Sequence, residues 1–460
     1  MQIKTVRTSG TIPHTPVIEP LSIDQNGTYT APTGVDGYSP ITVNVAEKEP
    51  VFSGATIYDY DGTVIETYTP EEFAALSAYP THPTHEYLTP NGYNVALATA
   101  QAYAAKYGYV EVGAQYYTVD RKTRLFITLE DFTLNFRLGL GVNGSVDVDW
   151  GDGSAHGTMT GSNINTLVQL GHVYSTGGNY VITLTVTGTA AITGDLTPDF
   201  ISKISNSGES RQDFFACVPY INSLTKLFIG DNISLIDRPF FRYTRLEYVL
   251  IPDNIDMTNG DGTFDECNSL KAIIVPNGIT ELPEYFVNQS ECIETLVLPH
   301  TLLSIPKRMA TACYSLKSIV IPDRVTSIDD AALCNCSRLK QVILSDNITS
   351  IGTTAFAFCY NLEQIKLPDK CTTYGRAIFS TTPIVHLEIP AAATSIVSLA
   401  VMCALETLKF KSSIPPTITG SDPWDDFPID CIIYVPSGSL SAYTSASNYP
   451  DPNTYTYVEY

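Results

Sequence analysis

Acidic side chains that crowd together are the first candidates for chemistry in this sequence. The segment DVDWGDGS brings Asp147, Asp149 and Asp152 close along the chain, and carboxylate oxygens are ligands that calcium prefers. A calcium-binding loop places its ligands at alternate positions, with a central glycine and a distal glutamate. Because Trp150 interrupts that pattern, we interpret the segment as a turn between strands and expect no metal there.

Imidazole groups gather in the segment THPTHE, which offers His82, His85 and Glu86 as possible ligands. A zinc site of the H-E-x-x-H type needs both histidines on one face of a helix. The prolines of this segment prevent helical spacing, so we expect a polar loop.

Adjacent carboxylates occur at Asp329–Asp330 and Asp425–Asp426. Neighbouring side chains of an extended segment point to opposite sides, so neither pair forms the facing acid and base that glycoside hydrolysis requires. No G-x-S-x-G, P-loop or G-x-G-x-x-G motif stands in a suitable context. The sequence therefore predicts no catalytic residues, no metal and no cofactor, and a protein that is not an enzyme.

A phrase of about 23 residues recurs through the second half of the chain, as in CYSLKSIVIPDRVTSI and CYNLEQIKLPDKCTTY. One slot of the phrase holds Leu270, Leu316, Leu339 and Leu362, and Ile293 fills it between the first two. A fixed period of this length is typical of a solenoid, in which each repeat contacts only its neighbours. We expect eight or nine coils and an extended surface suited to binding.

Prolines follow the short apolar strand of successive repeats, at Pro276, Pro299, Pro322 and Pro368. Proline cannot donate a backbone hydrogen bond to a neighbouring strand, so it ends the strand and forces a corner. We assign these prolines a structural role.

Four of the ten cysteines share one slot of the repeat: Cys267, Cys313, Cys336 and Cys359. Same-slot residues of successive coils stack on each other, so we expect a column of buried, reduced thiols that act as small apolar groups. On this interpretation a serine in place of Cys336 would cost about 1 to 3 kcal/mol, because a buried hydroxyl would have no assured partner.

Composition and periodicity predict a multidomain, mainly β protein. The proposed parts are residues 1–50, a small β module; 51–120, a small α+β module; 121–190, a β-sandwich; 191–411, the solenoid; and 412–460, a C-terminal cap. In the α+β module, Thr69, Pro70 and Glu72 predict a capped helix. In the cap, the segment CIIYV can add one more strand to the last coil, and so cover its exposed edge.

The net charge of −22 opposes binding to nucleic acid and to anionic membranes. No segment approaches the apolar length that spans a bilayer, so we expect no membrane insertion. The N-terminal residues MQIKTVRTSGTIPHTP lack the apolar stretch of a secretory signal. The protein is therefore expected either to stay in the cell that makes it or to leave as part of an assembled particle.

The pattern L-x-x-I-x-I-P-x-x-V-T-S-I-x-x-x-A-F-x-x-C, carried by residues 216–411, resembles the BspA-like leucine-rich repeats of bacterial and phage surface proteins. Residues 346–362, DNITSIGTTAFAFCYNL, match the family phrase well. The resemblance implies a solenoid of binding repeats.

Two other segments resemble known modules. Residues 145–188, with the phrases VDVDWGDGS and HVYSTGGNYVITLTVTG, resemble a PKD domain, an immunoglobulin-like sandwich that implies a spacer or adhesive role. The segment NGTYTAPTGVDGYSPITVNV looks like a module of tail and other structural proteins of phages and prophages from gut Firmicutes. Together these resemblances imply a phage structural protein, with the first module attached to the particle.

The leading hypothesis is a non-enzymatic tail or head fibre-like appendage on the virion surface. It would bind a host-surface glycan or protein through the solenoid. Its other expected partners are virion structural proteins and further copies of the same chain. The alternatives are a BspA-like adhesin on the bacterial surface and, third, a tail-associated glycan depolymerase. Aromatic side chains suit contacts with sugars and proteins, and the candidates are Tyr243, Tyr248, Tyr285, Tyr314, Tyr360, Tyr374 and Trp424.

Overall fold

The computed structural model describes residues 27–29, 41–43, 53–129, 135–192, 196–197, 223–236, 241, 244–253, 255–398, 405–420, 423–424 and 427–460. The chain divides into two compact units, Met1–Glu49 and Pro50–Tyr460. In the first unit, β1 (Gly27–Tyr29) pairs antiparallel with β2 (Ile41–Val43). The protein is mainly β, as predicted, and few helices occur in the described residues. None of these helices is long and apolar enough to cross a membrane.

The second unit begins with an α+β region built on a sheet of strand order β4-β3-β6-β5. Its elements are β3 (Gly54–Tyr58), β4 (Val64–Tyr68), α1 (Pro70–Ala75), β5 (Leu88–Tyr93), α2 (Leu97–Tyr107) and β6 (Tyr109–Thr118). Helix α1 begins as predicted: the Thr69 side chain accepts from the Glu72 backbone N–H, and the Glu72 carboxylate accepts from the Thr69 N–H. Helix α2 ends at Gly108, whose φ of 85° suits glycine.

Long antiparallel strands follow: β7 (Thr123–Leu129), β8 (Asn135–Asp149), β9 (Gly157–Val173), β10 (Gly178–Ile192) and the short β11 (Leu196–Thr197). Strand β8 pairs with β9, β10 and β11. Strand β7 pairs with β10 on one side and with the first solenoid strand, β12 (Leu224–Phe228), on the other. Because these strands share one sheet and one hydrophobic core with the solenoid, the predicted separate sandwich is not confirmed.

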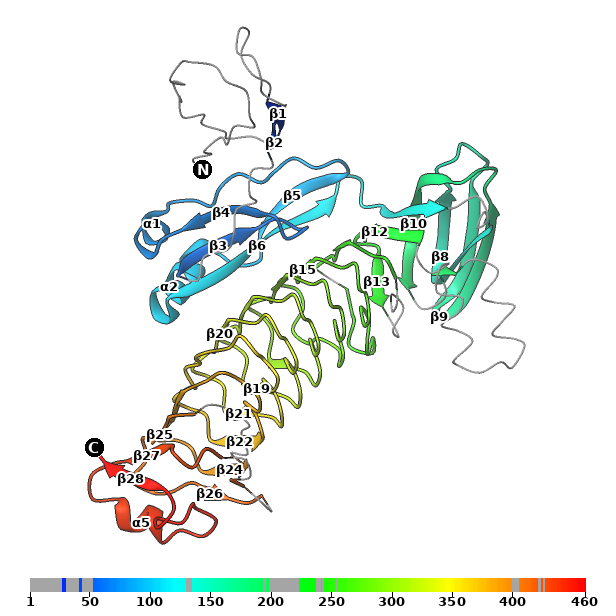
Figure 1. Ribbon diagram of the computed structural model, residues 1–460. Coiled ribbons are helices and arrows are strands. Elements are labelled where there is room, and N and C mark those ends of the chain that lie inside the picture. The colour runs from blue at the N-terminus through cyan, green and yellow to red at the C-terminus, as the bar shows by residue number, and fades with distance from the viewer. Residues whose placement is uncertain are drawn as a thin grey trace, which may run out of the picture. The chain divides into compact units, whose positions relative to one another are not determined.

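About nine turns of solenoid follow, in agreement with the predicted eight or nine coils. Figure 1 shows the coils stacked in sequence from β12 to β27. One row of parallel strands comprises β12, β14 (Tyr248–Leu250), β15 (Ala272–Ile274), β16 (Thr295–Val297), β18 (Ser318–Val320), β20 (Gln341–Ile343), β23 (His386–Ile389), β25 (Thr407–Phe410) and β27 (Ile432–Val435). A second row comprises β17 (Ser304–Ile305), β19 (Ser327–Ile328), β21 (Ser350–Ile351), β22 (Thr373–Arg376), β24 (Ser395–Ser398) and β26 (Thr417–Ile418). Strand β13 (Ile233–Ile236) pairs with β10.

Each coil turns its corners in the same way. The four predicted corner prolines, Pro276, Pro299, Pro322 and Pro368, are buried, and their carbonyl groups accept from the backbone N–H three residues later, as at Pro322 and Val325. The proline corners are thus confirmed. A second bend holds non-glycine residues at positive φ, in two columns of 23-residue spacing: Tyr285, Arg308, Ala331, Thr354 and Ala377, and Glu266, Gln289, Ala312, Asn335, Phe358 and Thr381. There the N–H of Arg308 donates to Asp330 of the next coil, and that of Asn335 donates to Ala357.

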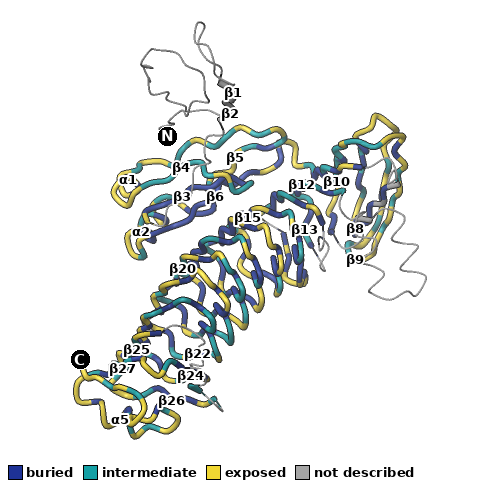
Figure 2. The backbone as a smooth tube through the Cα atoms, in the orientation of Figure 1, coloured by how far each residue is buried: buried dark blue, intermediate teal, exposed yellow. Residues whose placement is uncertain are grey.

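The four predicted cysteines lie fully buried in the interior of the coils, and all are free thiols. Figure 2 shows this buried interior continuing through the stack. Each Sγ donates to a backbone carbonyl 26 residues earlier, as from Cys313 to Val287 and from Cys336 to Ala310. Ser290 occupies the same slot between Cys267 and Cys313, and its Oγ donates to the Phe264 carbonyl at 2.7 Å. The premise that a serine at Cys336 would lack a partner was therefore wrong, because this slot supplies an acceptor.

The C-terminal segment continues the first strand row. Strand β27 pairs with β25, and β28 (Thr456–Glu459) pairs with β27, both in parallel. Ile433 and Val435 are buried, while Ile432 and Tyr434 lie on the other, half-buried face. Helix α5 (Leu440–Thr444) brings the buried Tyr443 against Phe410, with ring centroids 5.0 Å apart.

Glu111 of β6 is buried where the α+β region meets the solenoid, and it accepts hydrogen bonds from Ser318 Oγ and Tyr109 Oη. Desolvation raises the pKa of the Glu111 carboxyl to about 7, above its ordinary value of 4.5. Between about pH 4.5 and about pH 7, the native protein therefore retains a proton on Glu111 that the unfolded chain has released.

We predict that Cys336→Ser changes the free energy of unfolding by less than about 1 kcal/mol, because serine can still donate to the Ala310 carbonyl. Cys336→Val has a similar size but no donor. It should cost about 1 to 3 kcal/mol, because it leaves that buried carbonyl without its partner. Urea unfolding of both variants measures the difference. Equal stability of the two variants would contradict the hydrogen-bonding role of the thiol.

Truncation after Lys411 removes β26, β27, α5 and β28, and so leaves the edges of β24 and β25 and the ring of Phe410 uncovered. Exposed strand edges recruit other chains, so the truncated protein should aggregate or melt at a much lower temperature. Light scattering and calorimetry measure these effects. Deletion of residues 1–49, a separate compact unit, is the control and should leave the melting of the solenoid unchanged.

Stability should fall as the pH rises from about 4.5 to about 7, by about 3 kcal/mol from Glu111, and this contribution should stay level above that range. Glu111→Gln stays neutral and should remove this part of the pH profile. The variant should match the wild type near about pH 4 and melt at a higher temperature near about pH 8. Glu71→Gln, on an exposed part of α1, is the control. Parallel profiles for Glu111→Gln and wild type would refute the prediction.

Candidate functional site

The first strand row of the solenoid carries an outward-pointing row of apolar side chains on its earlier coils. Its members occupy matching positions on successive strands: Phe228, Leu250, Ile274, Val297, Val320 and Ile343. Apolar side chains that point away from the interior need a cover, since exposing them to water is unfavourable.

The α+β region provides that cover. Tyr58 packs on Ile274 and Val297, Tyr60 and Tyr116 pack with Phe228 and Leu250, and Val320 belongs to the core of the region itself. The packing is close: a Cβ atom added to Gly113 would come within 2.2 Å of the Ile274 side chain. Polar contacts border it, since Tyr103 Oη donates to the Ile321 carbonyl and Tyr107 Oη donates to Asp323. The covered part of the strand face is thus occupied by the protein's own chain.

Beyond Ile343 the same outward row changes character. One repeat later stands Lys366, and the paired strands β23, β25 and β27 place Glu388, Lys409 and Tyr434 in register. Lys366 and Glu388 are exposed, and Lys409 and Tyr434 are half-buried. We call this uncovered stretch, with its flanking residues, the open strand face.

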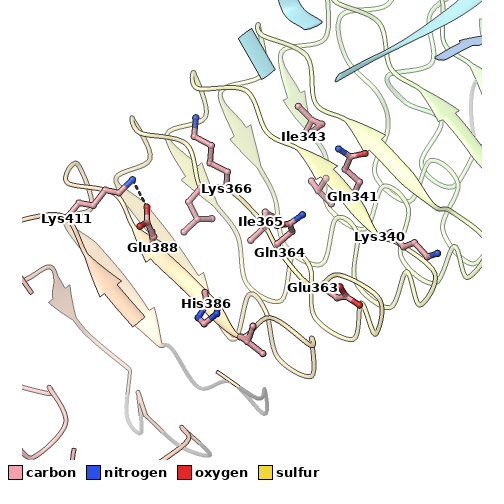
Figure 3. Close-up of a pocket in the computed structure, with 13 residues that line it drawn as sticks. Lys340, Gln341, Ile343, Glu363, Gln364, Ile365, Lys366, His386, Glu388 and Lys411 are labelled. Carbon is pink, nitrogen blue, oxygen red and sulfur yellow. Dashed lines mark ion pairs between the residues drawn. The ribbon is translucent and has the colours of Figure 1, made fainter. Parts of the chain in front are cut away.

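A groove of about 760 Å³ lies at the start of the open strand face. Figure 3 shows its charged and amide side chains, which come from three successive coils and from Lys411. Its lining consists of Lys340, Gln341, Val342, Ile343, Glu363, Gln364, Ile365, Lys366, Leu367, Val385, His386, Glu388 and Lys411. Residues 363–367 form no strand here, so the row is interrupted between β20 and β23. The interruption coincides with the groove.

A second hollow of about 390 Å³ adjoins the groove and shares His386 and Glu388 with it. Its other lining residues are Leu387, Thr407, Lys409, Tyr434 and Tyr460. His386 Nδ1 lies 2.8 Å from Thr407 Oγ1. The ammonium group of Lys409 lies over the Tyr460 ring, 4.4 Å from its centroid.

Two ion pairs of Glu388 lie where the two hollows meet. The Glu388 carboxylate lies 2.8 Å from Lys411 Nζ and 3.3 Å from Lys409 Nζ. The hydrogen bond from Lys411, with a further one from Lys409, lowers the pKa of Glu388, and the pKa of Lys411 is raised in turn. Glu388 therefore remains an anion held by two cations, which makes it a poor proton donor or acceptor.

The aromatic residues predicted from sequence do not converge on this groove. Tyr374 is buried, with 3% of its surface exposed, so its prediction as a binding residue was wrong: it faces the core at an inward slot of β22. Tyr248 lies beside Tyr60 under the α+β region, and Trp424 packs edge-on against Phe427 in the C-terminal segment. Tyr243 falls outside the described residues.

Three predicted tyrosines do lie at the bends of the coils. Tyr314 and Tyr360 are exposed at one slot, two coils apart, and Arg308 lies over the half-buried ring of Tyr285. None of the three tyrosines lines either hollow of the open strand face. Their role in binding stays a prediction.

The acidic and imidazole clusters form internal pairs. His172 stacks on the buried Trp150 and bonds to Asp152 at 2.8 Å, which ties the DWGDGS turn to β9. His156 lies 2.9 Å from Asp147. No group of three or more potential metal-ligating residues is assembled within the described part of the chain.

The loop histidines contact groups of the protein itself. His85 Nε2 lies 2.6 Å from the buried Asp59 carboxylate, and His82 Nε2 lies 2.6 Å from the Gly92 carbonyl. These contacts fasten the loop before β5, as the expected polar loop requires. Asp329 and Asp330 follow β19 at a bend, and Asp425–Asp426 lies outside the described residues.

Sequence reasoning missed the groove residues Lys366, His386 and Glu388. A signal was present in the slot two residues before each strand-ending proline. This slot is apolar up to Ile343, where Ser345 takes the place of the proline. In the next two repeats the slot holds the charged residues Lys366 and Glu388. Such a change within a repeat marks where a covered face becomes an open one.

Comparison with known proteins bears on the repeats. The family model of the BspA type leucine rich repeat region matches residues 214–313 and 304–416, in six copies. No curated protein matches the chain. A leucine-rich repeat protein from Bacteroides ovatus is similar, with 18% identity and a TM-score of 0.27 over 52% of this chain and 74% of that one. A leucine rich cell surface protein from Faecalibacterium prausnitzii is similar with 20% identity and a TM-score of 0.28, over 49% of this chain and 76% of that one. The pneumococcal vaccine antigen PcpA is similar with 14% identity and a TM-score of 0.32, over 50% of this chain and 72% of that one.

The repeat period, the stacked coils and the family match agree on the same stretch of chain. Residues 214–416 match the BspA type leucine rich repeat region.

Proposed function

We propose that this protein is a non-enzymatic binding protein, displayed as an adhesin on a bacterial surface, and that it contacts its partner through the open strand face. The change of the outward row from apolar to charged residues beyond Ile343 carries this proposal. The chain covers the strand face where that face is apolar and leaves it open where it is polar.

The open strand face has the composition of a recognition surface. Gln364, His386 and Thr407 offer hydrogen-bond donors and acceptors, and Tyr434 and Tyr460 offer rings. None of these side chains is needed to fill the solenoid core, which is built from the inward slots. Binding is therefore the role that explains why they gather there.

The carboxylates at this site favour binding over glycoside hydrolysis. Glycoside hydrolysis needs one carboxyl group that donates a proton and another that attacks or activates water. Glu388 is held ionised by Lys411 and Lys409, and Glu363 is exposed on the neighbouring coil. The arrangement suits a fixed pattern of charges better than proton transfer.

A virion appendage is the second candidate. It is favoured by the segment NGTYTAPTGVDGYSPITVNV, which resembles modules of phage structural proteins and contains the paired strands β1 and β2. In that setting the first unit would attach to the particle, and the PKD-like region would act as a spacer. Immunogold labelling of purified particles and of whole cells from the same culture separates the two candidates: label on particles favours the virion.

We predict that the fluorescently labelled full chain binds intact cells, and that Gln364→Ala combined with His386→Ala weakens this binding at least about tenfold, since each substitution removes a hydrogen-bonding group from the contact. Flow cytometry over a panel of bacterial and epithelial cells gives the titration. Both side chains are exposed, so the fold should be unaffected.

The control is Thr349→Ala combined with Thr372→Ala, which lie one residue before β21 and β22 of the second strand row, in two of the coils that line the groove. This variant should bind like the wild type. Equal loss in both variants, or no binding of the wild type to any cell in the panel, would count against the open strand face as the contact surface.

A further inference from the structure

The groove and the adjoining hollow form one trough along the open strand face. They share His386 and Glu388 and extend from Lys340, in the coil of β20, to Tyr434 on β27. Neighbouring strands lie about 4.8 Å apart, so the four coil-to-coil steps between these residues span on the order of 20 Å. A trough of this length suits a chain molecule better than a single small ligand.

The charge of the trough is opposite to that of the protein. Four lysines and two glutamates line it, Lys340, Lys366, Lys409 and Lys411 against Glu363 and Glu388, whereas the whole chain carries −22. Glu388 is already neutralised by Lys409 and Lys411. Within the described residues, Lys340 and Lys366 form no ion pair with a carboxylate. Two cations thus remain for an anionic ligand.

The other lining groups match the surface of a sugar. Amide, imidazole and hydroxyl groups of Gln364, His386 and Thr407 can both donate to and accept from hydroxyl groups. The rings of Tyr434 and Tyr460 stand at the far end of the trough, where aromatic faces can contact the apolar side of a sugar ring.

An acidic peptide fits this trough less well. Extended peptides commonly bind by pairing with a strand edge. The gap between β20 and β23 is occupied by residues 363–367 of the chain itself, which blocks an added strand. Side-chain recognition is therefore the main route to binding here.

We propose that the trough binds an anionic polysaccharide, with Lys340 and Lys366 contacting its carboxylate groups and the Tyr434–Tyr460 end contacting its sugar rings. This inference rests on the proposed function and specifies the class of partner. Because the contact is electrostatic, binding weakens as the ionic strength rises.

The test uses the full chain and polygalacturonate, with dextran as the neutral polymer and poly-L-glutamate as the peptide polyanion, followed by biolayer interferometry. We expect binding to polygalacturonate and not to dextran. Lys340→Ala combined with Lys366→Ala should weaken it by roughly 10- to 100-fold, since each charge-assisted contact contributes roughly tenfold or less. Lys307→Ala, an exposed lysine on a bend outside the strand face, removes a cation elsewhere and should leave binding unchanged.

Melting curves of the variants establish that each is folded. Equal binding to dextran, binding only to poly-L-glutamate, or an unchanged affinity of the folded double variant would each overturn the inference. Absence of binding to polygalacturonate would overturn it too. If the protein still bound cells through Gln364 and His386 in that case, the proposed function would stand and only the class of partner would be wrong.

Discussion

Hydrogen bonding between successive coils is the interaction on which the rest of this structure depends. A single coil has too small an interior to fold alone, so its stability comes from its neighbours. Strand pairs such as Ile319 with Val342, bends such as Asn335 with Ala357, and the thiol of Cys336 on Ala310 all join residues at or near the repeat spacing. Strand pairing nevertheless tolerates small changes of spacing, as from His386 to Thr407 and from Thr407 to Ile432. The first strand row is interrupted at residues 363–367, and the groove lies there.

The same dependence explains why both ends of the solenoid are occupied. The first coil receives β7 in antiparallel pairing with β12, and the last receives β27 and β28. A stack built from neighbour contacts leaves an unsatisfied layer at each end. The long strands β8 and β10 belong to the sheet that covers the first layer, so this region contributes to the solenoid as well as preceding it.

Much of this architecture can be predicted from the residues. The period of Leu316, Leu339 and Leu362, the proline corners and the buried cysteine slot follow from repetition alone. The hydrogen bond of each thiol could also have been anticipated, since Ser290 stands 23 residues before Cys313 and indicates that the slot accepts a donor. The contact of Tyr58 and Gly113 with Ile274 could not, because nothing in a single sequence reports which distant segment covers an outward row. For the same reason the tyrosines did not identify the binding surface. The sequence does not distinguish Tyr374, which is buried, from Tyr360, which is exposed.

The bends with positive φ have a consequence for how such a protein can change. Tyr285, Arg308, Ala331, Thr354 and Ala377 share one backbone conformation although their side chains are aromatic, cationic, small and hydroxylic. The conformation is imposed by hydrogen bonds to the next coil, and the strain that any side chain other than glycine brings there is modest in each coil. The outer surface of the bends can therefore vary in chemistry from copy to copy while the backbone path stays constant. A family of such chains can acquire new surface specificities on this side by single substitutions, without remodelling the coil that carries them.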